Sequence, residues 1–149
     1  TISILKQASA FVSLSEREIQ DFVSACDLVS FGVGDVLIKL GERGSRMYLL
    51  LEGQVKVSVP EAGKPGRERV LVRRFMNQVV GEFAMLSDAP RTANVIAEKT
   101  TKCLALDRDA FRRLETKYGS TFATLLGIKP SRARASTIAA AHTALELDM

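Results

Sequence analysis

The residues best suited to chemistry lie within residues 80–95, where a glycine, a carboxylate and an arginine occur close together. Gly81 and Glu82 precede a short apolar segment that is long enough for one helical turn, and a Ser-Asp-Ala-Pro corner then leads to Arg91. The first backbone N–H groups of such a turn have no intrahelical partner and attract anions. Gly81 has no Cβ, so a ligand can approach its main chain closely, and the Arg91 guanidinium is a planar fork that suits two phosphate oxygens. Residues 80–95 therefore predict an anion-binding site.

Glu82 indicates what else the ligand carries. A carboxylate only accepts hydrogen bonds, so its natural partner here is a sugar hydroxyl and not the anion. One phosphate, one ribose hydroxyl and an apolar wall together describe a nucleotide.

Three sequence blocks resemble the cyclic-nucleotide-binding domain family, in order and at fitting spacing. Residues 80–95 resemble its phosphate-binding cassette, residues 41–57 its glycine-punctuated hairpin, and residues 102–114 the exit from strand to helix in cyclic-nucleotide-dependent kinase regulators. The resemblance implies that Glu82 accepts from the ribose 2′-OH and that Arg91 binds the cyclic phosphate. It also implies that backbone amides act as further donors. The implied ligand-binding residues are Gly81, Glu82, Phe83, Ala84, Arg91, Thr92 and Ala93.

The same resemblance implies a regulatory domain that binds cAMP or cGMP and needs no other cofactor. Binding would be transmitted through the C-terminal helices, residues 108–127, to an effector domain or subunit, expected to be a protein kinase. The base would lie against apolar strand residues, with Val70, Val72 and Ile96 as candidates, and Tyr118 is one candidate for a lid over it.

Each of these residues also has an ordinary interpretation. Arg91 alone is an unremarkable arginine after a proline turn, and Glu82 alone is an acid at a helix N-terminus, where the dipole favours it. A domain that keeps the fold but has lost its ligand is a further alternative. The joint presence of Glu82, Arg91 and the flanking blocks favours the ligand-binding interpretation.

Two positions bear on how the ligand is held. Many family members carry an acidic residue where this chain has Ser45, and that acid relays to the phosphate-binding arginine, so the relay is in doubt here. Family members that prefer cGMP often have Thr directly after the arginine. Thr92 therefore gives cGMP a slight edge, although a small β-branched residue also suits a strand.

Composition sets the limits. A chain of 149 residues with 46% hydrophobic and 26% charged residues suits one globular domain, and no window is apolar enough for a membrane span.

Cys26 and Cys103 are far apart and predict free thiols, as in a cytoplasmic protein. The net charge is +4, but the basic residues are not interleaved with aromatic residues as they are in a nucleic-acid-binding groove. No nucleic-acid partner is therefore expected. No nucleophile elbow, Walker loop or metal-ligand cluster occurs, so no enzymatic activity is expected.

The hydrophobic pattern predicts an α+β fold, an antiparallel β-roll with helices at both ends, and the resemblance implies that the N-terminal helices form a helical bundle and that further helices follow the roll at its C-terminal end. Helices are expected within residues 2–26, the second of them with a capping box from Ser15 to Glu18, and the β-roll spans residues 28–107. Residues 60–69, rich in Pro and Gly, are expected to form an exposed loop. Helices follow in residues 108–127. One domain would thus end at residue 127, before a linker and an Ala-rich helix in residues 128–149 that contains a kinase-substrate-like motif at Ser136.

Two rival functions use the same fold. The chain could be the sensor half of a catabolite-activator-type transcription factor, which would need a dimerisation helix and a helix-turn-helix beyond it. It could instead be a scaffold that binds no nucleotide.

Overall fold

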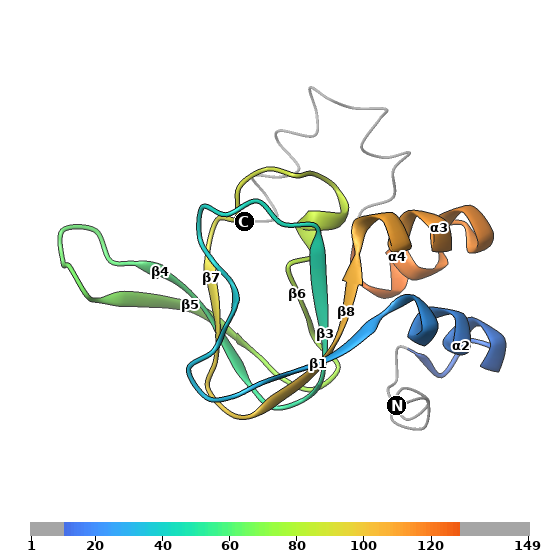
Figure 1. The fold of residues 1–149 in the computed structure, drawn as a ribbon, viewed down its shortest axis with the longest axis horizontal. Helices are drawn as coiled ribbons and strands as arrows, with labels where there is room; N and C mark the ends of the chain where they lie inside the picture. The colour runs from blue at the N-terminus through green and yellow to red at the C-terminus, as the bar shows by residue number, and fades with distance from the viewer. Residues whose placement is uncertain (1–10, 129–149) are drawn as a thin grey trace.

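The computed structural model describes residues 11–128, which form an antiparallel β-roll of two four-stranded sheets with helices on one side (Figure 1). The expected α+β fold is confirmed. In chain order the elements are α2 (Glu16–Ala25), β1 (Asp27–Phe31), β2 (Val36–Ile38), β3 (Arg46–Glu52), β4 (Val55–Pro60), β5 (Glu68–Arg74), β6 (Val79–Val80), the 3-10 helix η2 (Glu82–Met85), β7 (Asn94–Ala97), β8 (Thr101–Asp107), α3 (Arg108–Tyr118) and α4 (Thr121–Leu125).

The strand orders are β1-β8-β3-β6 in one sheet and β2-β7-β4-β5 in the other. All the pairings are antiparallel, so strands distant in the sequence become neighbours, such as β3 beside β8 with Tyr48 opposite Ala105. The β4–β5 hairpin projects from the roll on the side away from the helices (Figure 1). Helices and hairpin thus lie at opposite ends of the molecule.

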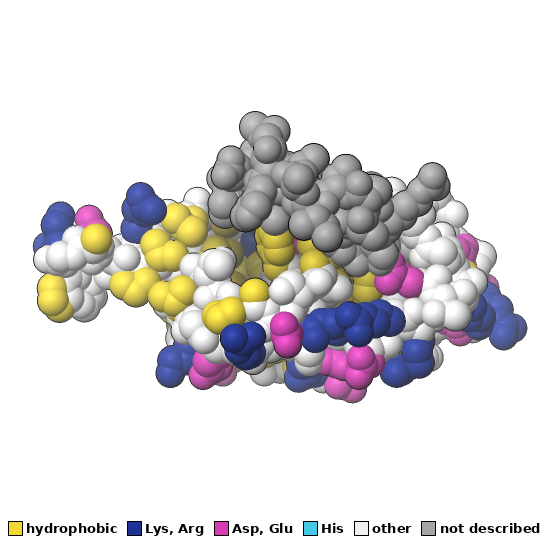
Figure 2. All heavy atoms as spheres, turned by 90° about the horizontal axis from the view of Figure 1, so that it is seen from above, with side chains coloured by type: hydrophobic (Ala, Val, Ile, Leu, Met, Phe, Trp, Pro, Cys, Tyr) yellow, Lys and Arg dark blue, Asp and Glu magenta, His cyan; other side chains and the backbone are white. Residues whose placement is uncertain are grey.

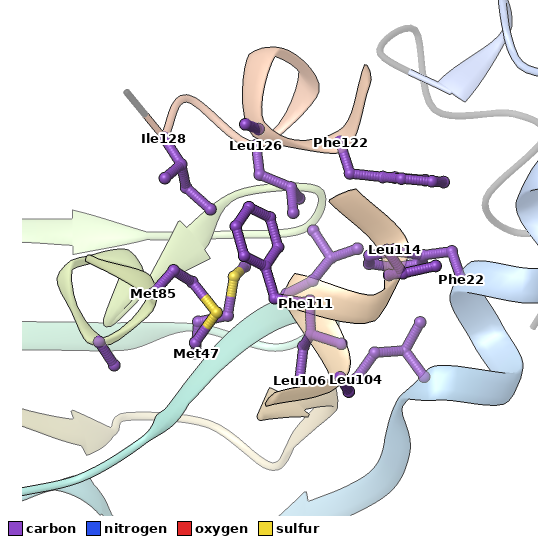
Figure 3. Close-up of a cluster of buried hydrophobic side chains, with 14 of the residues drawn as sticks. Phe22, Met47, Met85, Leu104, Leu106, Phe111, Leu114, Phe122, Leu126 and Ile128 are labelled. Carbon is purple, nitrogen blue, oxygen red and sulfur yellow. The ribbon is translucent and has the colours of Figure 1, made fainter. Parts of the chain in front are cut away.

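Strands β3 and β8 are buried on both faces, which explains their nearly continuous hydrophobic sequences. Alternate side chains of a strand point to opposite faces. Met47 and Leu49 of β3 therefore join the cluster beneath the helices, whereas Tyr48 and Leu50 join a second cluster inside the roll. Figure 3 shows the first cluster, in which Met47, Leu104 and Leu106 of the sheet meet Phe111, Leu114 and Phe122 of α3 and α4.

Local sequence determines where α2 begins. Ser15 Oγ accepts from the Glu18 amide at 3.1 Å, and Glu18 Oε1 accepts from the Ser15 amide at 2.9 Å, so the expected capping box is confirmed. The helix then buries Ile19 and Phe22, and the Phe22 ring stacks on Phe122 of α4 with centroids 5.2 Å apart. This stack joins the N-terminal helix to the helices that follow the roll.

Polar contacts strengthen this joint. The Asp21 carboxylate on α2 accepts from Lys117 Nζ at 2.6 Å and also from the Tyr118 hydroxyl, both on α3. Tyr118 in turn packs edge-on against Phe122, with ring centroids 5.7 Å apart. Helices α2, α3 and α4 are therefore held together as one helical module.

The structure corrects two strand predictions. The exposed loop expected over residues 60–69 is shorter, because Pro60 ends β4 and Glu68 begins β5. The two-residue strand β6 was not predicted, because so short a segment has no periodicity. The helix expected in residues 2–10, the Ala-rich helix and the Ser136 motif lie outside the described residues, and the domain boundary at residue 127 stays a prediction.

Candidate functional site

The predicted cassette is built around η2, the single helical turn expected from the sequence. Gly81 precedes it with φ +77, in the left-handed region that glycine adopts without strain. A Cβ on Gly81 would lie 2.6 Å from Ile38 Cδ1 and 3.1 Å from Arg91 Nη1. Glycine is therefore required here by its conformation and by its neighbours within the protein, in addition to any approach of a ligand.

Arg91 lies beside Gly81 with its guanidinium anchored by main-chain oxygens. Nη1 donates to the Gly81 carbonyl at 3.2 Å, and Nη2 donates to the Arg46 carbonyl at 2.6 Å. Gly44 also lies close to this guanidinium, since a Cβ there would lie 2.9 Å from Arg91 Nη2, and a larger residue would displace the guanidinium from its present position. Carbonyls therefore hold this guanidinium in place of the acidic relay that many family members have.

The loop between β2 and β3 is hydrogen-bonded to the cassette. The Arg91 amide donates to the Glu42 carbonyl and the Gly41 amide donates to the Arg91 carbonyl, both at 2.8 Å. Arg43 Nη1 donates to the Asp88 carbonyl at 3.0 Å, which adds a side-chain link. Residues 39–45 and 81–93 therefore form one continuous structure around Arg91.

A pocket of about 270 Å³ opens beside this structure. Its lining consists of Leu37, Ile38, Lys39, Glu42, Arg43, Gly44, Ser45, Arg46, Tyr48 and Arg91. Four of these side chains are cationic and one is acidic, so the lining favours an anion. Figure 2, which views the molecule from above, shows hydrophobic side chains gathered beside the projecting hairpin.

The electrostatics of Arg91 also favour an anion. Burial is the largest cause that lowers the pKa of Arg91, and the nearby Arg108 charge acts in the same direction. No carboxylate among the described residues forms an ion pair with Arg91, although Glu82 lies near enough to act on its pKa. A partly buried guanidinium without a paired anion is costly, and a bound anion would offset that cost.

The other predicted site residues lie around η2 and the turn that follows Arg91. Glu82 is the first residue of η2 and is partly exposed, Phe83 is 52% exposed, and Ala84 is buried. The Ala84 amide donates to the Gly81 carbonyl at 3.0 Å, so a ligand using that amide would have to replace this bond. Thr92 is exposed and Ala93 partly buried in the bend before β7.

Sequence reasoning missed residues at the junction of β8 and α3. Asp107 caps α3, and its carboxylate accepts from the Ser45 hydroxyl, so Ser45 contacts the helix junction. Arg108 donates to the carbonyls of Ala84 and Ser87. Because these acceptors are main-chain groups more than twenty residues away, no side-chain pattern in the sequence could have indicated them.

The strand register places two of the candidate residues around the base, Val72 and Ile96, on different faces of their sheet, and the role of each stays a prediction. Directly opposed residues in antiparallel strands lie on the same face. Val72 lies opposite Val57, which faces the interior of the roll, whereas Ile96 lies opposite Lys56 on the other face. Tyr118 is occupied by its hydrogen bond to Asp21 within the helical module.

The described residues offer no sign of other chemistry. Between residues 11 and 128, no group of His, Cys, Asp and Glu side chains is arranged to hold a metal ion, and no helix is long and apolar enough to cross a bilayer. Cys26 and Cys103 are free thiols, and burial raises the pKa of each to about 12. Both thiols are therefore protonated and unreactive at neutral pH.

Comparisons with known proteins agree with this geometry. The family model described as "Cyclic nucleotide-binding domain" matches residues 28–118. The chain is 34% identical over 113 residues to a cAMP-dependent protein kinase regulatory subunit of Dictyostelium discoideum, and 33% identical over 116 residues to the cGMP-dependent protein kinase egl-4 of Caenorhabditis briggsae. These matches cover 74% and 76% of this chain but only 34% and 15% of the two relatives.

Among solved structures, the N-terminal domain of a transcriptional regulator from Streptomyces coelicolor A3(2) is similar, with a TM-score of 0.70 and 26% identity. That match covers 95% of this chain and 94% of the other. The matched family is a regulatory, ligand-binding domain and not a catalytic one. The family match spans most of the described strands and the whole cassette, and the chain therefore belongs to the cyclic nucleotide-binding domain family.

Proposed function

We propose that this chain binds cAMP or cGMP at the pocket beside Arg91 and transmits binding to an effector through its C-terminal helices. The cyclic phosphate would be bound by the Arg91 guanidinium and by main-chain amides of the cassette, and the ribose 2′-OH would donate to Glu82. The proposed ligand-binding residues are Gly81, Glu82, Phe83, Ala84, Arg91, Thr92 and Ala93.

The state of Arg91 is the observation that carries this proposal. A guanidinium has five N–H donors. Among the described residues two of them are used, for the carbonyls of Gly81 and Arg46, which leaves three for a ligand. The group is held rigidly, lacks a paired carboxylate and lines the cationic pocket, so it is arranged in advance for an anion.

Glu82 supports the sugar contact. Its side chain is partly exposed, and within residues 11–128 it makes no hydrogen bond or ion pair. The carboxylate is thus available to a hydroxyl donor close to the phosphate position. The exposed Thr92 hydroxyl is similarly available to a base, which supports the slight preference for cGMP.

The effector is proposed from relatives. The two sequence relatives named above are a protein kinase and a regulatory subunit of a protein kinase. This favours a kinase effector in the cytoplasm, where free thiols such as Cys26 and Cys103 persist. Transmission through α3 and α4 is supported by the cluster in Figure 3, which joins Met85 of η2 to Phe111 and Leu126. A displacement of η2 would therefore act directly on side chains that α3 and α4 pack against.

A second candidate is the sensor domain of a transcription regulator. The match to the Streptomyces domain covers almost all of both chains, and this observation favours it. The two candidates share the ligand and differ in the effector, so the sequence of the full-length protein distinguishes them. A kinase domain or a helix-turn-helix beyond this chain decides between them.

Calorimetric titration with cAMP and cGMP tests the ligand, with non-cyclic 5′-AMP and 5′-GMP as controls. We expect saturable 1:1 binding of at least one cyclic nucleotide and much weaker binding of the non-cyclic forms. Saturation at a concentration 100 times Kd should stabilise the fold by about 2.7 kcal/mol in thermal unfolding. Neither heat nor stabilisation with either cyclic nucleotide would contradict the proposal and favour the scaffold alternative.

A further inference from the structure

Arg108 stands at a position where a cation is locally unfavourable. It is the first residue of α3, directly after the N-cap Asp107. The helix dipole places partial positive charge at this end, so an acid stabilises the first turn and a base opposes it. A residue that conflicts with its local preference is usually explained by contacts elsewhere. Arg108 is also partly buried, so its side chain is directed into the protein.

The Arg108 guanidinium binds main-chain oxygens of two separate segments. Nε donates to the Ala84 carbonyl at 2.5 Å, and Nη2 donates to the Ser87 carbonyl at 3.1 Å and to the Gly44 carbonyl at 3.4 Å. Charge-assisted hydrogen bonds of this kind are stronger than those between neutral groups. One side chain therefore ties the start of α3 both to the cassette and to the loop between β2 and β3.

These segments are the ones that hold Arg91. The Ala84 amide donates to the Gly81 carbonyl, which also accepts from Arg91 Nη1. Gly44 lies against the other edge of the Arg91 guanidinium, since a Cβ there would be 2.9 Å from Nη2. Two short routes thus connect Arg91 with Arg108, one through η2 and one through the 44–45 peptide.

We propose that Arg108 is a positioning residue that locks the cassette to α3, so that the ligand site and the first turn of α3 move together. This inference rests on the proposed function for the identity of the ligand. A ligand that draws on Arg91 and on the η2 amides displaces the peptides whose carbonyls Arg108 holds, and the helix follows. Because coupling is reciprocal, removing Arg108 weakens both the binding of the ligand and the response of the helix.

Three variants of the whole chain test this. Arg108→Ala removes every contact, and Arg108→Lys keeps the charge but not the planar fork that reaches several carbonyls. Arg112→Ala is the matched control, because Arg112 is exposed on the same helix. Affinity for cAMP and cGMP is measured by calorimetry, and hydrogen exchange of the amides in residues 109–118 is measured with and without ligand at equal fractional saturation.

We expect Arg108→Ala to bind about 10-fold more weakly than the unchanged chain, within the 5- to 150-fold range typical of coupled sites. Arg108→Lys should fall between the two, and Arg112→Ala should bind within twofold of the unchanged chain. The ligand-induced change in α3 exchange should persist in Arg112→Ala and shrink to less than half in Arg108→Ala. A structural role alone would lower the melting temperature but leave affinity and this exchange response unchanged, and that result would overturn the proposal.

A ligand-free measurement separates this proposal from the proposed function. Without nucleotide, Arg108→Ala should speed exchange in residues 81–88 and 43–46 relative to Arg112→Ala. If the unchanged chain binds no nucleotide, the proposed function fails, while faster exchange in those segments still supports the lock by Arg108. Equal exchange in the two variants contradicts the lock. Should Arg108→Ala not fold, Arg108→Lys gives the same comparison.

Discussion

Substituting Gly81 by alanine measures how much the geometry of the cassette depends on one missing Cβ. Alanine at φ +77 costs about 1 kcal/mol or slightly more from its left-handed conformation. The new Cβ would also lie 2.6 Å from Ile38 Cδ1, and Ile38 is buried, so its side chain must leave its preferred rotamer at a cost of about 1 kcal/mol. We therefore expect Gly81→Ala to lower the free energy of unfolding by about 2–3 kcal/mol.

Gly63→Ala provides the matched control. Gly63 has φ +73, but a Cβ there meets nothing within 4 Å, so this variant bears the backbone strain alone, about 1 kcal/mol. Urea unfolding of both variants gives the difference, which we expect to be about 1–2 kcal/mol, and thermal unfolding should show Gly81→Ala melting roughly 5–10 °C lower than the unchanged chain. Equal destabilisation of the two variants would refute the reasoning, because the contacts with Ile38 and Arg91 would then carry no cost.

Three further predictions concern the capping box, the helical module and ligand selectivity. Ser15→Ala should lower the free energy of unfolding by about 1 kcal/mol in urea titrations, whereas the exposed Ser13→Ala should change it little. The hydrogen bond from Lys117 lowers the pKa of Asp21 in the folded protein. The ionised Asp21 carboxylate therefore contributes its full stabilisation of the fold above its ordinary pKa of about 3.9, and this contribution is lost as the pH falls through the lowered pKa. The free energy of unfolding, measured as a function of pH, should therefore fall less steeply below that pH in Asp21→Asn than in the unchanged chain. Thr92→Ala should reduce the affinity for cGMP relative to cAMP in calorimetry, and an unchanged ratio would show that Thr92 does not read the base.

Much of the fold could be predicted because local signals agreed with the tertiary structure. The capping box at Ser15 depends on nearest neighbours, and the structure has it. The chain also turns after Glu52 at Gly53, but this turn joins β3 to β4, which lie in different sheets and do not pair, so the hairpin expected there is wrong. The hydrophobic runs of β3 and β8 were recognisable as strands. Their sequences did not reveal that two separate clusters bury their opposite faces.

The contacts of the site were harder to predict, because main-chain oxygens supply them. Because Ser45 stands where many family members have an acid, the sequence put the relay to Arg91 in doubt. In the structure its guanidinium is held by the Gly81 and Arg46 carbonyls, and every residue has a carbonyl whatever its side chain. Ile96 was chosen for its hydrophobicity, but the strand alternation places it on the face opposite Val95.

The most direct test of the central claim is calorimetric titration of Arg91→Lys with whichever cyclic nucleotide the unchanged chain binds more tightly. Lysine keeps the positive charge but loses the planar fork, and a hydrogen bond to a charged group contributes about 1.5–3 kcal/mol. Arg91→Lys should therefore bind about 10- to 100-fold more weakly than the unchanged chain, while the exposed control Arg69→Lys should bind as tightly as the unchanged chain. Equal affinity in Arg91→Lys and Arg69→Lys would contradict the assignment of Arg91 as the phosphate ligand.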